Sequence, residues 1–204
     1  MCMSFEASKD STGRAPRRSN GIKRREAILT AAAEIISESG IAGLTLHATA
    51  RRANSSIGSM YHFFGDKEQL LEGLRDRHRK NMAQIMQHIL EIGDEDWRRM
   101  TSTEVIEALF GRPIRYYSDN PFALELHQLH EGQAIDSFLL LVERVMKGRL
   151  DDTRGYQAAR MLFAISSGTL AFTLDVRNMQ RRALVAEIPA ALTSYLASLE
   201  ATIA

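Results

Sequence analysis

The spacing of apolar residues after position 22 predicts a first amphipathic helix. Apolar side chains recur at intervals of three and four, which gathers on one helical face Ile28, Leu29, Ala32, Ile35 and Ile36. Gly40 follows, and a glycine just past the last helical residue commonly ends a helix. Residues 1–20 hold Ser, Thr, Gly, Pro and Arg with almost no large apolar residue, so we expect a flexible basic arm there.

Two short helices joined by a tight turn are predicted next. Thr45 is a good cap for a helix that continues through position 52. The Asn-Ser pair at 54–55 favours a turn, and Ser56 can cap a third helix that reaches about position 63. This arrangement predicts a helix-turn-helix, whose second helix lies in the major groove of DNA.

The rest of the chain predicts helices with no strand alternation, so we expect an all-α protein. Asp66 caps a long fourth helix, and Gln69 completes a pair that resembles a capping box. The expected segments are 67–91, 101–118, 121–131, 133–148, 154–177 and 182–202. Pro113 and Pro189 fall inside two of them and should kink or split those helices.

The third helix has one candidate inner face and one candidate outer face. We expect Met60 to point inward in preference to Ile57, with Phe63 or Phe64 beside it. Small or hydrogen-bonding residues then remain on or near the outer face: Ser56, Gly58, Ser59, Tyr61 and His62. The helix N-terminus favours phosphate through its free N–H groups, so these residues predict a DNA contact.

Charge and composition narrow the class of protein. The net charge is +1, but residues up to Lys80 carry +5 and the remainder −4, so only the first part is suited to a polyanion. No apolar run approaches the roughly 18 residues of a membrane span, and no secretory signal is evident. The single cysteine, Cys2, excludes a disulfide framework and fits a reducing cytoplasm, where we expect the protein.

Residues 24–72, about a quarter of the chain, carry a family pattern. The matching positions are Arg25, Ile28, Leu29, Ala31, Ala32, Gly40, Leu44, Thr45, Ala50 and the run Ser59, Met60, Tyr61, His62, Phe63, Phe64, Gly65, Asp66, Lys67, Glu68, Gln69, Leu70 and Leu71. They resemble the N-terminal domain of TetR-family repressors. The resemblance implies a DNA-binding domain over residues 21–66 and a helical domain over 67–204 that dimerises and holds a small effector.

The resemblance also assigns roles to single positions. The positions that it implies contact DNA are Thr45, His47, Ser56, Ile57, Gly58, Ser59, Tyr61, His62 and Lys67. Tyr61 and Lys67 match phosphate contacts, and His62 matches a variable reader. The sequence departs from the family at Asn54-Ser55, where Gly-Val is usual, and at Ile57, where a polar residue is common. Ile57 is suited to contact a thymine methyl group.

The acidic remainder predicts an assembly surface and a ligand cavity. Two amphipathic segments, 154–177 and 182–202, would pair with their copies in a four-helix bundle, which makes the chain a homodimer. Methionine and aromatic residues are adaptable linings for an apolar effector. The candidates for such a lining are Met82, Ile85, Met86, Trp97, Phe110, Tyr117, Phe122, His127, Phe138 and Phe163.

Three functional readings remain open. The first is a repressor that an apolar ligand releases from a palindromic operator. The second is a ligand-independent DNA-binding dimer that a protein partner regulates. The third is a helical enzyme or a metal-binding protein, for which His127 and His130 have suitable spacing. No phosphate loop, nucleophile elbow or paired carboxylates stand out, so we expect no enzyme activity, cofactor or metal.

Overall fold

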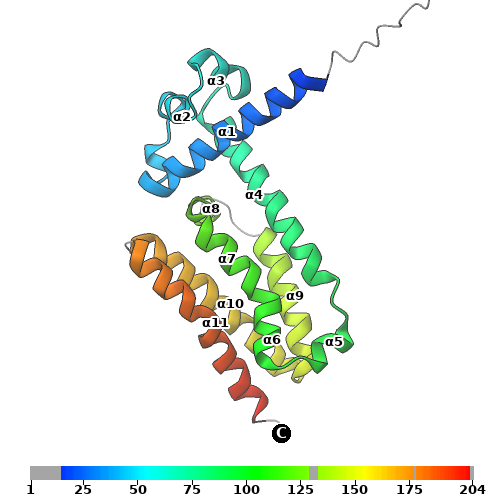
Figure 1. The fold of residues 1–204 in the computed structure, drawn as a ribbon. Helices are drawn as coiled ribbons and strands as arrows, with labels where there is room; N and C mark the ends of the chain where they lie inside the picture. The colour runs from blue at the N-terminus through cyan, green and yellow to red at the C-terminus, as the bar shows by residue number, and fades with distance from the viewer. Residues whose placement is uncertain (1–14, 129–132, 177, 203–204) are drawn as a thin grey trace, which may run out of the picture.

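The computed structural model describes residues 15–128, 133–176 and 178–202. These residues form helices and contain no strand, which confirms the all-α prediction. A small N-terminal group consists of α1 (Ala15–Ser39), α2 (Leu46–Arg52) and α3 (Ile57–Phe63). The long α4 (Lys67–Leu90) runs from this group into a larger one, as Figure 1 shows.

The larger group comprises seven more helices of the described chain. They are α5 (Asp94–Arg99), α6 (Ser102–Ile106), α7 (Arg112–Asp119), α8 (Pro121–Gln128), α9 (Gln133–Arg149), α10 (Asp152–Phe172) and α11 (Asn178–Glu200). α9, α10 and α11 pack side by side, with α6 and α7 across them (Figure 1). α8 lies apart, beneath α1 (Figure 1).

The predicted caps fix the short N-terminal helices. Thr45 Oγ1 accepts from the N–H of residue 48 at 3.1 Å, and Ser56 Oγ accepts from the N–H of residue 59 at 3.1 Å. Asp66 Oδ1 accepts from the N–H of Gln69 at 2.8 Å. Each bond satisfies an N–H group that has no partner within its helix. Gly40 ends α1 with φ +67°, a left-handed conformation that glycine adopts without strain.

Several predicted helix boundaries differ from the structure. α1 already begins at Ala15, so the end of the expected arm is helical. The helix α5 was not predicted, because Gly93-Asp94 looks like a break. Three acidic residues in its first turn and two arginines in its last suit the helix dipole and stabilise this short element. The expected 154–177 segment ends as an α-helix at Phe172, followed by a 3-10 turn.

The two prolines have different effects on the predicted helices. A π-helical turn, Glu107–Gly111, joins α6 to α7, and Pro113 follows it in the first turn of α7. The wider turn removes the need for the N–H that proline lacks. Pro189 lies within the continuous helix α11. The sequence predicted a kink or a split at both prolines. It did not indicate the π-helical turn before Pro113 or the continuous helix around Pro189.

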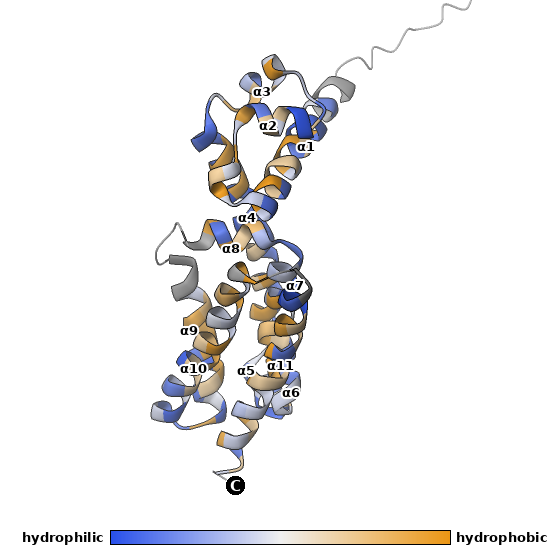
Figure 2. Ribbon diagram, turned by 90° about the vertical axis from the view of Figure 1, so that its left-hand side faces the viewer, coloured by the Kyte–Doolittle hydropathy of each residue, from blue (hydrophilic) through white to orange (hydrophobic). Residues whose placement is uncertain are grey.

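Two hydrophobic cores lie at opposite ends of α4, and Figure 2 shows the apolar residues gathered inside both groups. The N-terminal core takes residues from α1 to α4 and also Phe122, Ala123 and Leu126 from α8. The C-terminal core contains buried residues of α5, α6, α7, α9, α10 and α11. Helix α8 therefore packs with the helix-turn-helix, although it follows α7 in sequence.

Candidate nucleic-acid interface and ligand cavity

The outer face of α3 combines exposed apolar and polar side chains. Ile57 is 38% exposed and Tyr61 is 51% exposed, although both are large. No atom lies within 4 Å of the position that a Cβ on Gly58 would occupy. A DNA backbone can therefore approach α3 closely at this residue. Met60 and Phe64 point the other way, at 0% and 3% exposure, which confirms the predicted inner face.

The other predicted contacts surround this face. Ser59 and Phe63 are partly buried, while His62 is exposed at the end of α3. Thr45 and His47 are exposed at the start of α2, the helix that packs against α3. The oxygens of Thr45 and Ser56 accept from backbone N–H groups. Each hydroxyl therefore keeps its hydrogen for another acceptor, such as a phosphate oxygen.

Lys67, which the resemblance implies contacts phosphate, makes a hydrogen bond within the protein. Its Nζ donates to the carbonyl oxygen of Ile41 at 2.7 Å, and the side chain is partly buried. This bond ties the start of α4 to the turn that follows α1. A phosphate contact by Lys67 would compete with this carbonyl for the ammonium group.

The turn before α3 shows the consequence of its unusual sequence. Asn54 adopts φ +48°, a left-handed conformation that asparagine tolerates better than most residues other than glycine. Ser55 Oγ is buried and has no hydrogen-bond partner among the described residues. A buried hydroxyl without a partner costs free energy that an apolar residue would not.

An ion pair fixes α2 on α1. Arg52 donates to both carboxylate oxygens of Glu38, from Nη1 at 2.8 Å and from Nη2 at 2.7 Å. These bonds lower the pKa of Glu38 below its ordinary value and raise that of Arg52. Arg52 is therefore engaged with the scaffold. Arg51 is exposed beside it.

A cavity of about 360 Å³ lies among α4, α7, α9 and α10. Six of the predicted lining residues surround it: Met82, Met86, Phe110, Tyr117, Phe138 and Phe163. Ile85 and Trp97 pack in the C-terminal core instead, and Phe122 belongs to the N-terminal core. The side chain of His127 lies outside the described residues. Methionine and aromatic content alone does not distinguish a residue that lines a cavity from one that packs a core.

Five polar residues of the cavity lining were missed by sequence reasoning: His78, Arg79, Ser137, Ser166 and Ser167. His78 lies one helical turn before Met82, so the helical period of α4 contained a signal for it. Its Nδ1 lies 3.0 Å from the hydroxyl oxygen of Tyr116 in a hydrogen bond, and the two rings stack at 5.5 Å. Its ring centroid lies 5.8 Å from that of Tyr117.

Burial keeps the two tyrosines uncharged. It raises the pKa of Tyr117 to about 12, and it also raises the pKa of Tyr116. Neutral hydroxyls are therefore present at this end of the cavity at every physiological pH. Tyr117 contacts both hydrophobic cores, and Tyr116 packs against the N-terminal one.

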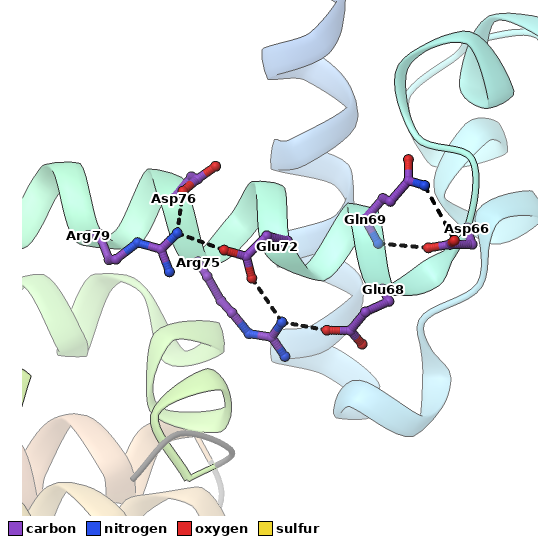
Figure 3. Close-up of polar contacts among 7 residues, drawn as sticks. All are labelled: Asp66, Glu68, Gln69, Glu72, Arg75, Asp76 and Arg79. Atoms are coloured by element: carbon purple, nitrogen blue, oxygen red, sulfur yellow. Dashed lines mark hydrogen bonds and ion pairs between the residues drawn. The ribbon is translucent and has the colours of Figure 1, made fainter. Parts of the chain in front are cut away.

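Arg79 at the edge of the cavity belongs to a chain of ion pairs along α4. Figure 3 shows its guanidinium bonded to Glu72 and Asp76, with Arg75 joining Glu72 to Glu68. The bonds from Arg79 and Arg75 lower the pKa of Glu72. The positive charge at the edge is thus balanced by neighbouring carboxylates on the same helix.

Neither a metal cluster nor a membrane span emerges from the described residues. No group of three or more His, Cys, Asp and Glu there is arranged to hold a metal ion. His130, part of the spacing considered for a metal, lies outside the described residues. None of the described helices is long and apolar enough to cross a membrane.

Comparison with known proteins assigns the N-terminal segment. Residues 28–74 match the family model described as "Bacterial regulatory proteins, tetR family". The HTH-type transcriptional regulator BetI of Burkholderia thailandensis is 47% identical over 49 residues, which are 24% of this chain and 25% of that protein. The chain therefore matches about a quarter of the length of this curated relative.

Solved structures share the fold over most of the chain. A TetR-family transcriptional regulator from Pectobacterium atrosepticum covers 89% of this chain and 96% of its own, with a TM-score of 0.55 and 19% identity. The transcriptional regulator FadR from Bacillus subtilis, solved in complex with stearoyl-CoA, covers 82% and 95%, with a TM-score of 0.51 and 22% identity. At such identities the likeness shows the fold.

Proposed function

The N-terminal domain of this chain belongs to the TetR family, and on that premise we propose that the protein is a cytoplasmic transcriptional repressor. It binds a palindromic operator as a homodimer and is released by a small, largely apolar ligand. The observation that carries the proposal is the outer face of α3, where Ile57 and Tyr61 stay exposed on a fully packed scaffold. Such side chains are suited to contact DNA.

The dimer is supported by a second, unpartnered face of α10. One side of this helix is buried in the core at Ala158 and Leu162, whereas Met161 is 48% exposed and Phe172 59% exposed. Helices α10 and α11 would bury these apolar side chains against their copies. A two-fold axis through that bundle would present the two α3 helices to successive major grooves, which lie about 34 Å apart in B-DNA.

The cavity supports control by a ligand. Its volume of about 360 Å³ and its lining of Met, Phe and Leu side chains suit a small apolar molecule. A ligand that binds better to a conformation with a different separation of the α3 helices lowers DNA affinity by linkage. The FadR structure with stearoyl-CoA is an example of a protein of this fold with an apolar chain bound.

Selection of genomic DNA fragments by the purified protein tests the proposal. We expect an inverted repeat whose half-sites lie one helical turn apart, and we expect Tyr61→Ala to abolish the enrichment. His88→Ala, an exposed residue of α4 far from α3, is the matched control and should select the same sequence. Binding without sequence preference at moderate salt would contradict operator recognition.

A ligand-independent dimer regulated by a protein partner is the second candidate, since the exposed apolar face of α10 also suits a partner. A thermal-shift screen with lipophilic compounds separates the two candidates. A ligand-controlled repressor is stabilised by some compounds and loses its operator when they bind. An unchanged melting temperature throughout the screen would favour the partner-controlled dimer. The relatives named above are regulators, so we expect no enzyme activity.

A further inference from the structure

The cavity is polarised along its length. Helix α4 contributes His78 near the DNA-binding domain and Met82 and Met86 farther away, on successive turns. Met86 lies eight positions after His78, which is a rise of about 12 Å along the helix. Helix α7 follows the opposite course, because Phe110 precedes it and Tyr117 lies near its end, beside His78. The polar end of the cavity therefore lies toward the DNA-binding domain.

The opposite end is an aromatic floor of Phe110, Phe138 and Phe163. The Phe110 and Phe138 rings meet edge to face with centroids 5.5 Å apart, and those of Phe138 and Phe163 are 6.4 Å apart. These three side chains come from segments distant in sequence and meet only at the cavity. An alkyl or aryl group is the ligand part that such a floor accommodates.

The polar end offers hydrogen bonding without an unbalanced charge. The guanidinium of Arg79 is bonded to two carboxylates. The hydroxyls of Ser166 and Ser167 donate to carbonyl oxygens of their own helix at 2.9 and 2.7 Å. The burial of Tyr117 keeps its hydroxyl neutral. A ligand carboxylate would lose hydration here, and Arg79, the one Arg or Lys in the described lining, is already paired with two carboxylates.

We propose that the effector is an uncharged amphipathic molecule, with an alkyl or aryl body on the aromatic floor and one hydrogen-bonding group that replaces the Tyr116 hydroxyl on His78. The motivating geometry is the 3.0 Å bond from Tyr116 to His78, a residue of the cavity lining. This inference rests on the proposed function, because it names the ligand class and the regulation of the same cavity.

The hydrogen bond between His78 and Tyr116 lies at the border between the two hydrophobic cores. The carbonyl of Tyr116 accepts from the backbone N–H and the side-chain amide of Asn120, both at 2.9 Å, at the corner between α7 and α8. Helix α8 then inserts Phe122 into the N-terminal core. The Tyr116 hydroxyl also hydrogen-bonds Asn81 of α4, so its displacement from His78 removes one of its contacts with α4 and weakens the support of α8 beneath the DNA-binding domain.

The neighbour of His78 contacts the same region from the other side. The guanidinium of Arg77 lies 5.3 Å from the ring centroid of Phe122 and donates to the carbonyl oxygen of Leu29 at 3.3 Å. It also donates to Thr30 Oγ1 at 3.2 Å. Two successive residues of α4, His78 and Arg77, thus contact the cavity and helix α1, so a shift at His78 would reach α1 through its immediate neighbour.

Three probes with one apolar body test the ligand class on the full chain: heptylbenzene, para-heptylphenol and para-heptylbenzoate. Their dissociation constants are measured by isothermal titration calorimetry. We expect the phenol to bind about tenfold more tightly than the hydrocarbon, as one well-placed hydrogen bond allows, and the anionic benzoate to bind more weakly than the phenol. Equal binding of phenol and hydrocarbon, tighter binding of the benzoate, or no binding of any probe would overturn the inference.

Three variants test the exchange at His78. His78→Phe should remove the advantage of the phenol and leave heptylbenzene binding intact, which also verifies that the cavity is folded. Tyr116→Phe should tighten phenol binding several-fold, because no hydroxyl must be displaced, and should reduce the loss of DNA affinity that the phenol causes. His88→Phe, an exposed histidine of the same helix, is the control and should leave all three affinities unchanged.

Different results would contradict the proposed function and the proposed exchange at His78. If the protein selects no operator, the proposed function fails while the calorimetric comparison of the probes still decides the ligand class. If an operator is bound and Tyr116→Phe changes neither the phenol affinity nor the phenol-induced release of DNA, the exchange at His78 is wrong and operator recognition stands.

Discussion

The DNA-binding domain and the cavity domain place their functional side chains in opposite ways. In α3, Met60 is 0% exposed in the core while its neighbour Tyr61 is 51% exposed. In the cavity, Phe110 is 1% exposed and both lines the space and packs the core. Packing and recognition are therefore carried by separate residues in the first region and by shared residues in the second.

This difference has consequences for substitutions. A change on the outer face of α3 should alter DNA affinity with little effect on folding. A change in the cavity lining should alter ligand affinity and stability together, because the same atoms serve both. Variants at adjacent positions of one helix give the sharpest test of that separation.

Met60→Ala should cause the largest loss of stability among these variants. Its side chain is fully buried among α1, α3 and α4, so truncation should lower the free energy of unfolding by about 3 kcal/mol. Urea denaturation followed by circular dichroism measures this loss. Tyr61→Ala is the matched control and should change stability by less than about 0.5 kcal/mol while weakening DNA binding. Equal destabilisation by both variants would refute the separation of roles.

Arg77→Met tests the border between the regions. It removes the two hydrogen bonds to α1 and the stacking on Phe122, and we expect a loss of about 2 kcal/mol in the unfolding of the N-terminal domain. Burial lowers the pKa of Arg77, consistent with a partly desolvated guanidinium. Calorimetry should show the N-terminal domain melting ahead of the rest. The exposed Lys80→Met is the control, and a single unchanged transition in Arg77→Met would contradict the role of this residue as a tie.

Ile57→Ala tests recognition alone. If Ile57 contacts a thymine methyl group, the variant should lose about 1 kcal/mol of operator affinity, roughly fivefold, without loss of stability. Deoxyuridine in place of the contacted thymidine should cause the same loss in the parent protein and no further loss in the variant. Fluorescence anisotropy on labelled operators measures both. Additive losses would show that Ile57 and the methyl group are not in contact.

The sequence predicted the N-terminal region better than the cavity region for a physical reason. Caps such as Thr45 and Ser56, and the left-handed turn at Asn54, are decided by residues three or four apart, so a local pattern contains the necessary information. The inner face of α3 follows from helical period and apolarity. The bond from Lys67 to Ile41 was missed because it joins residues 26 positions apart.

The cavity depends on contacts that no local pattern records. Trp97 and Phe138 are both aromatic, yet Trp97 fills the core and Phe138 lines the cavity, which depends on how helices distant in sequence pack together. Phe122 was assigned to the cavity because it is aromatic and aromatic residues suit an apolar lining. Docking of α8 against α1 places it in the other core.

Glu38→Gln should cause the smallest change in free energy among these variants. It tests an ion pair at the solvent-exposed surface of the DNA-binding domain. The pair with Arg52 is exposed, so its contribution is modest and is screened by salt. Because the bond to Arg52 lowers the pKa of Glu38 in the folded protein, its stabilisation is fully present above the unfolded value near 4.5 and is lost as the pH falls through the lowered folded value. Thermal melts of both proteins should therefore differ slightly at neutral pH and low salt and converge in acid or in high salt. A difference that persists in acid would mean that Glu38 acts by packing and not by charge.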